Sequence, residues 1–409
     1  MDSAIFAFVE DLTELLTPTP VSNDSVGAVP QHLGITVAAA YHQARDVTPH
    51  GPSRLTWRRD GVHFPPGSHY GRLRPPVQDD AGDEPLAALR TSTRNRGTAM
   101  NGWAVFCHNT TLGLANPDVT QLTCFGDRAA PADLCPANPD VGEYSVALAR
   151  DVARLGVDTV VTESLHYGFL GHGYHHERSF AGLGPVEEFA FGLCFCVFCL
   201  RLEGAEQARE ECRAALDRVF AGGPAVSDEL TIDSLGPHTA VFLRARTAVV
   251  TSLVAGVAAA VAEEGSRLVF LDITGALKGY GDGLPTGVPA AEDAWRIGVD
   301  PAAVASATGP AGAGYALLAY ARDPGRVAAD VAAYRSVCGR DVMLRAVLRP
   351  GPPDTGSAAE LAAKVEAAGR AGADGVDFYA FGLLTVDALA RIGSTRPRPD
   401  VGPFEEVIT

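Results

Sequence analysis

Residues 138–163 read NPDVGEYSVALARDVARLGVDTVVTE, and this stretch carries one complete helix and strand unit. It opens with an Asn-Pro pair, which is typical of the start of a helix. Apolar residues then recur at helical spacing as far as Gly156, which predicts an amphipathic helix over residues 140–155. The β-branched run Val157–Thr162 follows and predicts a buried strand, which delivers the acidic residue Glu163 at its end.

The same alternation of short apolar strands and longer helices continues on both sides of this stretch. Strands in such a pattern are parallel and are covered by helices on both faces of the sheet. Strand candidates lie near residues 35, 61, 102, 157, 268, 315, 342 and 375. Eight units of this kind predict a (β/α)8 barrel. An open doubly wound sheet is the alternative, and it is disfavoured because no strand precedes a GxGxxG or Walker-type phosphate loop.

The predicted barrel occupies residues 31–395 of the chain. Residues 1–30 are expected to form an N-terminal helical arm and a Pro/Ser/Asn-rich linker, and residues 396–409 a C-terminal tail. A large insertion, about residues 164–266, follows the fourth strand. Within it, the run Phe189–Val219 is expected to be helical.

Charge and composition narrow the classes of function. The chain has 33 basic and 49 acidic residues, which gives a formal net charge of −16. This balance argues against a nucleic acid or an anionic membrane as partner, because both attract clustered Lys and Arg. The longest apolar stretch, Ala248–Ala262, is shorter than the roughly 20 residues of a membrane span and predicts a buried helix. Eight cysteines are too few for a disulfide scaffold. Acidic residues interrupt the apolar residues near the N-terminus, which argues against a signal peptide. We therefore expect a cytoplasmic protein with reduced thiols.

Two carboxylates stand at the ends of neighbouring predicted strands, where a barrel places its active site. Glu163 follows the fourth strand and Asp272 lies at the end of the fifth. Paired carboxylates can act as acid and nucleophile, or as acid and base, at a sugar acetal. We expect both side chains to open into one pocket as catalytic residues. The alternative is that each caps a helix or pairs with a buried arginine such as Arg345.

Other polar residues at the strand ends are expected to bind the substrate, because a pocket for a polar ligand needs them there. They are Tyr41, His42, His108, Asn109, Arg345, Asp377 and Tyr379.

The segment His166–Glu177 holds four of the eleven histidines, and its glycines predict a loop. Because the loop leaves the strand that delivers Glu163, we expect it to lie over the barrel mouth. His166, His175, His176 and Glu177 are the substrate-binding candidates within it. A transition-metal site and a purely structural loop are the alternatives.

Cys194, Cys196 and Cys199 form a CxCxxC group. Together with one histidine they could make a Cys3His zinc site. The surrounding run Phe189–Leu200 is almost wholly apolar, and free cysteine is commonly a small buried hydrophobe. We expect these thiols to be reduced, buried and metal-free, with zinc binding and a redox role as alternatives.

The segment Leu134–Tyr144, which reads LCPANPDVGEY, and the strand that delivers Glu163 resemble uncharacterised glycoside-hydrolase-like (β/α)8 barrel proteins. Further segments that resemble the same group are Tyr41-His42, Phe106–Asn109 and the CxCxxC run. The resemblance covers residues 33–381. It implies that Glu163 holds an acidic position that is often catalytic, and that Asp272 matches a fifth-strand position that is acidic in some alpha-amylase-like enzymes.

These expectations favour a hydrolase of carbohydrate metabolism, a glycosidase or glycosyl-transfer enzyme that acts on a small soluble glycoside through paired carboxylates. A non-catalytic sugar- or metabolite-binding barrel is one alternative. A non-hydrolytic lyase or isomerase of secondary metabolism that uses the histidine loop is another. We expect no cofactor and no metal. The sequence names neither the sugar nor the oligomeric state.

Overall fold

The computed structural model describes residues 2–16, 30, 32–50, 53–79, 82–172, 178–309 and 313–395. The strands are β1 (Asp2–Ala7), β2 (Gly34–Tyr41), β3 (Ala44–Val47), β4 (Leu55–Arg58), β5 (Gly61–Val62), β6 (Met100–Val105), β7 (Thr159–Glu163), β8 (Arg267–Asp272), β9 (Gly314–Leu318), β10 (Met343–Leu348) and β11 (Gly375–Phe378). The helices are α1 (Leu12–Leu16), α2 (Asp83–Arg96), α3 (Thr110–Ala115), α4 (Pro139–Arg154), α5 (Pro185–Gly192), α6 (Ala205–Phe220), α7 (Pro237–Glu263), α8 (Thr274–Gly279), α9 (Ala290–Asp293), α10 (Pro301–Ala307), α11 (Pro324–Cys338), α12 (Ala358–Arg370) and α13 (Val386–Gly393).

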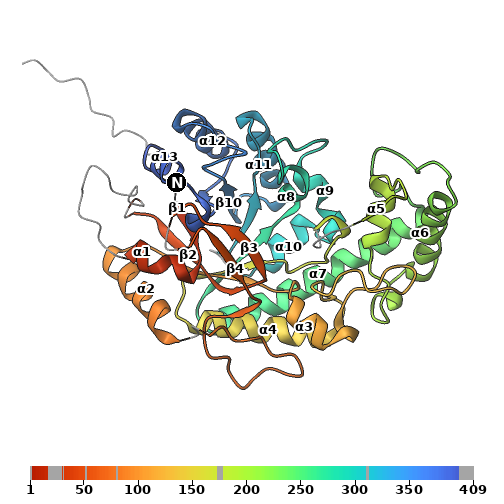
Figure 1. The fold of residues 1–409 in the computed structure, drawn as a ribbon, viewed down its shortest axis with the longest axis horizontal. Coiled ribbons are helices and arrows are strands. Elements are labelled where there is room, and N and C mark those ends of the chain that lie inside the picture. The colour runs from red at the N-terminus through yellow and green to blue at the C-terminus, as the bar shows by residue number, and fades with distance from the viewer. Residues whose placement is uncertain are drawn as a thin grey trace, which may run out of the picture.

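Eight parallel strands form a closed cylinder. They pair in the order β1, β11, β10, β9, β8, β7, β6 and β2, and β2 pairs back with β1. Helices surround the cylinder in Figure 1. Closure leaves no barrel strand with an unpaired edge, which explains why every residue of β2 is buried. The predicted (β/α)8 barrel is confirmed.

Alternate residues of each barrel strand face the inside, as the two-residue period of a strand requires. In β7, Thr159 and Val161 line a small cavity at the amino-terminal end of the barrel. Glu163, two residues further on, lines a larger cavity at the opposite end. Val160 and Thr162 are fully buried and belong to the other face of the strand, toward the helices.

The helix before β7 forms as predicted. The side chain of Asn138 accepts a hydrogen bond from the backbone N–H of Asp140, and Pro139 occupies the first helical position. Val141 and Leu148 belong to a stripe of buried residues along α4. This stripe packs on the sheet and on α7, which fixes the direction from which β7 enters the barrel.

The N-terminal prediction is wrong in one respect. Residues 2–7 form barrel strand β1, whereas a helical arm was expected, and a 3-10 turn over Val9–Asp11 and the short helix α1 follow them. The uninterrupted apolar run Ala4–Val9 is instead typical of a strand buried on both faces, and it pairs with β2 and β11. The barrel therefore begins at residue 2, and not at residue 31.

The strand predicted near residue 61 is also not part of the barrel. Gly61–Val62 forms β5, which runs antiparallel to the end of β2. The first barrel strand is β1, and β2, which was predicted as the first, is the second. The strands predicted as third to eighth are the third to eighth strands of the barrel.

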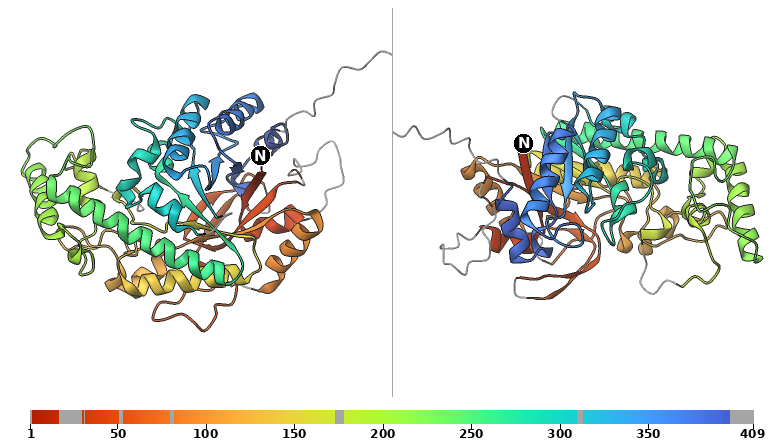
Figure 2. Two further views of the ribbon diagram at one scale, coloured as in Figure 1. Left: turned by 180° about the vertical axis from the view of Figure 1, so that it is seen from behind. Right: turned by 90° about the horizontal axis from the view of Figure 1, so that it is seen from above.

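The insertion lies between β7 and β8, where it was expected. The predicted helical run Phe189–Val219 is broken, because residues 193–204 separate α5 from α6. These two helices stand away from the barrel as a lobe, and α7 runs back from the lobe along the barrel (Figure 2). By length and composition, α7 is the one described helix that could cross a membrane. It packs against α4, α6 and α10 with twelve buried residues, so the predicted buried helix is confirmed.

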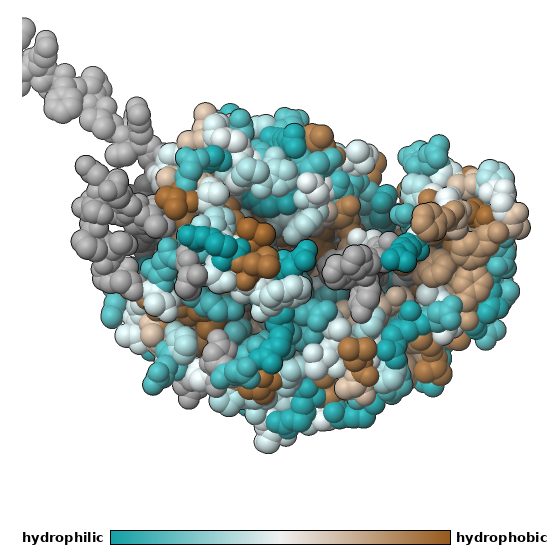
Figure 3. Space-filling model, viewed as in Figure 1, coloured by the Kyte–Doolittle hydropathy of each residue, from teal (hydrophilic) through white to brown (hydrophobic). Residues whose placement is uncertain are grey.

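The surface of the lobe is notably apolar. Figure 3 shows brown residues gathered over the part of the molecule that carries α5 and α6. Phe220 at the end of α6 is about half exposed, and Phe180 before α5 is almost fully exposed.

Candidate active site

A cavity of about 640 Å³ opens at the carboxyl-terminal end of the barrel. Tyr41 ends β2, Glu163 ends β7, and Tyr379 follows β11, so three predicted site residues from distant parts of the chain meet in this cavity. His42, the residue after β2, lines it as well. We call this space the mouth cavity.

Glu163 is a carboxyl group inside the mouth cavity. Its Oε2 accepts a hydrogen bond of 2.7 Å from the indole Nε1 of Trp103 on β6. Burial raises the pKa of Glu163 to about 7, although the Trp103 bond and nearby His108 act to lower it. The group can therefore hold a proton near neutral pH. The next residue, Ser164, adopts a left-handed backbone with φ of 54°, which turns the chain sharply after the carboxyl group.

Tyrosines form much of the wall around this carboxyl group. Tyr41 and Tyr379 face each other with their hydroxyl oxygens 3.4 Å apart. Tyr280 and Tyr320 line the same cavity. Burial raises the pKa of Tyr41, Tyr320 and Tyr379 well above the ordinary value, so these hydroxyl groups stay protonated. The wall thus offers flat apolar faces and hydroxyl groups together, which suits a ligand with both kinds of surface.

A chain of histidines extends from the cavity toward a buried aspartate. The ring of His42 stacks on Tyr41 at 4.3 Å and meets the ring of His108 edge-on at 5.2 Å. His108 Nδ1 lies 3.1 Å from Oδ1 of the buried Asp133. Burial lowers the pKa of His42 to about 3, so that imidazole is neutral. Asp133 orients His108 in the way a carboxylate orients a catalytic imidazole.

His166 is buried and is not among the residues that line the mouth cavity. Its Nδ1–H donates to the backbone carbonyl of Tyr167 at 2.8 Å. Its Nε2 is buried and has no hydrogen-bond partner among the residues that the structure describes. Burial lowers the pKa of His166, so the ring is neutral and Nε2 carries a lone pair. His175, His176 and Glu177, the other candidates of this loop, lie outside the described residues.

The structure contradicts the predicted pairing of Glu163 with Asp272. Asp272 is fully buried and accepts hydrogen bonds from the backbone N–H and the hydroxyl of Thr274, and from the hydroxyls of Tyr315 and Tyr334. Leu271 on β8 and Ile273 just after it line the cavity, so Asp272 between them faces the helices. The carboxylate joins β8, β9 and α11, and it does not open into the mouth cavity as expected.

Arg345 and Asp377 are also not in the mouth cavity. They form a two-point ion pair, with Nη2–Oδ1 and Nε–Oδ2 distances of 2.6 and 2.7 Å, that lines the small cavity at the amino-terminal end. Asp377 additionally accepts from the backbone N–H of Ala4. Asn109 has a local role, because its side chain caps α3 by accepting from Leu112 N–H. The structure does not place these three side chains at the mouth cavity as expected, because each polar group is used within the fold.

Several site residues were not predicted from the sequence. Trp103 lies within an apolar strand, and nothing in its neighbourhood marks it as the partner of Glu163. Asp133 stands in a loop 25 residues after His108. In the structure Gly168 lies against Asp133, since a Cβ at this glycine would meet Asp133 Cγ at 2.4 Å, but the sequence does not show this contact. Tyr280 and Tyr320 come from the segments after β8 and β9, which no motif singles out.

No family model and no curated protein matches this chain. Solved structures do resemble it. A beta-N-acetylhexosaminidase is 10% identical with a TM-score of 0.43, and the match covers 98% of this chain and 73% of that one. A GH18 chitinase from Pseudoalteromonas aurantia is 9% identical with a TM-score of 0.40, covering 97% and 100%. A class V chitinase from Pseudomonas fluorescens Pf-5 is 10% identical with a TM-score of 0.43, covering 96% and 99%. Likeness at this level bears on no more than the fold.

Proposed function

We propose that this chain is a glycoside hydrolase in which Glu163 is the general acid. The observation that carries the proposal is a carboxyl group with a pKa of about 7 inside a tyrosine-walled cavity at the barrel mouth. Hydrolysis of a glycosidic bond needs a carboxylic acid that is still protonated at working pH, so that it can protonate the leaving oxygen. A small soluble glycoside of the cytoplasm is the substrate we propose.

The second chemical role does not belong to Asp272. Among the described residues of the cavity, Asp46 is held by Arg58 at 2.7 Å, and Asp282 accepts from Leu284 N–H at the exposed rim. Glu163 is thus the one described carboxyl group of the cavity that combines a raised pKa with a position at a strand end. Some glycoside hydrolases work with one such acid because an acyl-amino group of the substrate acts as nucleophile. We therefore favour 2-acylamino sugars as substrates.

The test compares leaving groups in wild type and Glu163→Gln. Purified protein is assayed on chromogenic glycosides, with and without a 2-acetamido group, whose phenol leaving groups range from poor to good. We expect turnover of 2-acetamido glycosides, and a loss of about 10²–10⁴-fold in Glu163→Gln when the leaving group is poor. The loss should shrink with dinitrophenolate, because a good leaving group departs without protonation.

Asp282→Asn is the matched control, since it removes a carboxyl group at the cavity rim and should retain activity. Equal losses on all leaving groups, or unchanged activity in Glu163→Gln, would reject the general-acid role. Activity on glycosides without a 2-acetamido group alone would reject the 2-acylamino preference. It would leave the general-acid role of Glu163 intact.

One observation favours a second candidate function, a non-hydrolytic lyase or isomerase. His108 is held by Asp133 as an imidazole base would be, and the buried Nε2 of His166 has no hydrogen-bond partner among the described residues. In that case His108→Ala would abolish turnover while Glu163→Gln retained it, and the products would contain no added water.

A further inference from the structure

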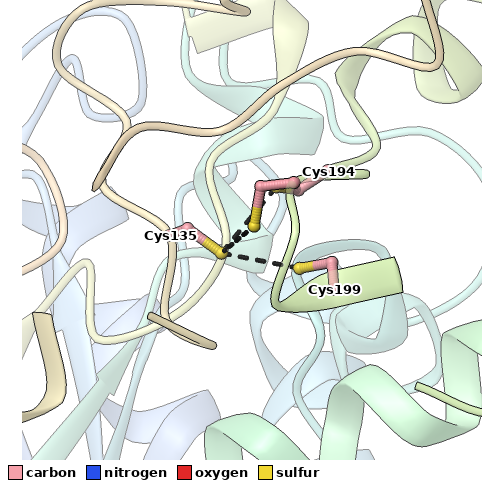
Figure 4. A group of neighbouring side chains, drawn as sticks. Cys135, Cys194 and Cys199 are labelled. Carbon is pink, nitrogen blue, oxygen red and sulfur yellow. Dashed lines mark hydrogen bonds between the residues drawn. The ribbon is translucent and has the colours of Figure 1, made fainter. Parts of the chain in front are cut away.

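Four cysteine sulfurs gather at a point away from the mouth cavity. Cys135 comes from the loop after β6, and Cys194, Cys196 and Cys199 come from the segment between α5 and α6. The four Sγ atoms all lie within 4.8 Å of one another. Figure 4 shows the sulfurs of Cys135, Cys194 and Cys199 turned toward one another from two separate segments. We call this group the four-sulfur cluster.

The sulfur spacing matches a tetrahedral metal site. The Sγ of Cys135 lies 3.5 Å from those of Cys196 and Cys199, and 3.7 Å from that of Cys194. A disulfide has an S–S distance of about 2.05 Å, and all four cysteines are free. Four thiolates at about 2.3 Å from one tetrahedral ion lie about 3.8 Å apart. A cluster of several iron atoms would hold the sulfurs further apart, because each thiolate would bind a different iron.

A buried cation beside the cluster provides an independent observation. Arg246 on α7 is fully buried, and none of its three guanidinium nitrogens has a hydrogen-bond partner within the described residues. Its guanidinium lies over the ring of Tyr167 at 4.2 Å, and the hydroxyl of Tyr167 lies 3.6 Å from Cys199 Sγ. A buried charge without a counter-charge is costly. Four thiolates around a divalent ion carry a net charge of −2, which would offset the guanidinium.

We propose that Cys135, Cys194, Cys196 and Cys199 bind one zinc ion as a closed structural site. Zinc is the ion that a tetrahedral set of four thiolates favours, and four protein ligands leave no open position for catalysis. Each thiol loses its proton when the ion binds. This proposal replaces the expectation of metal-free thiols. The sequence pointed to three cysteines and a histidine, and the fourth ligand is a cysteine 59 residues before Cys194.

The ion would join two segments that the barrel strands do not connect. The loop after β6 carries His108 and Asp133, and the segment after β7 carries His166 and Tyr167. A hydrogen bond from Phe195 N–H to the backbone carbonyl of Leu122 already brings these segments together. The zinc site would clamp them and keep the histidines in place.

The first test uses the wild-type protein, purified without chelators or affinity metals. We expect one zinc per chain by elemental analysis, and zinc–sulfur distances of about 2.3 Å with four sulfurs by X-ray absorption. Protein with less than stoichiometric zinc should take the ion up to one equivalent and gain thermal stability. The proposal would be overturned if the protein did not bind zinc. It would also be overturned if iron with inorganic sulfide were found at these sulfurs.

Variants then assign the site to the cluster. Loss of a group that contacts a metal ligand without binding the metal lowers metal affinity by roughly 10–100-fold. Cys135→Ser removes a ligand itself, so it should lower zinc affinity by more than this. Tyr167→Phe keeps all four ligands and the aromatic ring, and it should lower the affinity within that range. Cys212→Ala, which removes a buried cysteine of α6 outside the cluster, is the control and should keep its zinc. Zinc retained with full affinity in Cys135→Ser would overturn the assignment, and the Tyr167 variant provides a readout if the serine variant does not fold.

Discussion

Glu163 and Asp272 show that side-chain direction separates a catalytic candidate from a structural residue. Both are acidic residues at the end of a barrel strand, and both were predicted as catalytic. Glu163 lies at an inward position of β7, and Asp272 lies at an outward position of β8. A strand turns successive side chains to opposite faces. A carboxylate one residue away from an inward position therefore faces the surrounding helices and not the barrel interior. The sequence shows the strand and the acid, but it does not show the barrel's inner face.

The raised pKa of Glu163 predicts how activity depends on pH. A general acid works when protonated, so kcat/KM should fall as pH rises through about 7. The Trp103 hydrogen bond favours the ionised carboxylate. Trp103→Phe should therefore move the alkaline limb of the pH profile to higher pH, at some cost in stability from the smaller ring. An alkaline limb that stays in place in this variant would argue that another group controls it.

The same group should couple stability to pH. The pKa of Glu163 is about 7 in the folded state against an ordinary value of 4.5, so the folded state holds the proton more tightly. This carboxyl contributes stability at low pH, and the contribution is lost as pH rises from about 4.5 to about 7. Glu163→Gln removes that dependence, so the stabilities of the two proteins should diverge across this window in urea titrations.

Asp272 should matter for stability and not for the reaction. Asp272→Ala leaves three buried hydroxyls and one backbone N–H without their acceptor, and we expect a loss of about 3–5 kcal/mol in the free energy of unfolding. Tyr334→Phe removes a single hydrogen bond and should cost about 1 kcal/mol. Urea titration measures both. A folded Asp272→Ala protein that loses turnover by 10²-fold or more would show that the carboxylate does act in catalysis.

At the scale of elements, the strands with a continuous apolar run and a clear flanking helix were predictable. β7 and α4 follow from the Asn-Pro start, the helical spacing and the β-branched run, and the structure reproduces them. β1 was missed because acids follow its apolar run closely, although Ala4–Val9 is apolar throughout. The break between α5 and α6 was missed because its residues are as apolar as a helix core. Their sulfurs turn toward Cys135, a contact across the chain that local patterns do not contain.

Removal of β1 distinguishes a barrel strand from a dispensable arm. A chain that lacks residues 2–8 leaves β2 and β11 without a common neighbour, so the barrel cannot close. We expect this truncated protein to be insoluble or to lack a cooperative thermal transition. The control replaces exposed Thr13 of α1 with alanine, which should leave the transition close to that of wild type. A truncated protein that unfolds cooperatively at the wild-type temperature would contradict the role of β1.

At the scale of the whole molecule, the barrel brings together residues that the sequence sets far apart. Tyr41 and Tyr379, which are 338 residues apart in the chain, meet in the mouth cavity. At the amino-terminal end of the barrel, Asp377 pairs with Arg345 and accepts from the backbone N–H of Ala4. The polar residues that follow the strands predicted a polar cavity at the carboxyl-terminal end of the barrel. They could not predict which side chains are already used within the fold, because that depends on partners hundreds of residues away.

The closure of β1 against β11 has a consequence for biosynthesis. Asp377, the partner of Ala4, is made 373 residues after it. At roughly 5–20 residues per second, β1 waits roughly 20–75 seconds on the ribosome before that neighbour exists. Throughout this time one edge of an apolar strand has no native partner. The nascent chain is then most exposed to wrong pairing, and a chaperone that shields β1 would give the largest gain in yield.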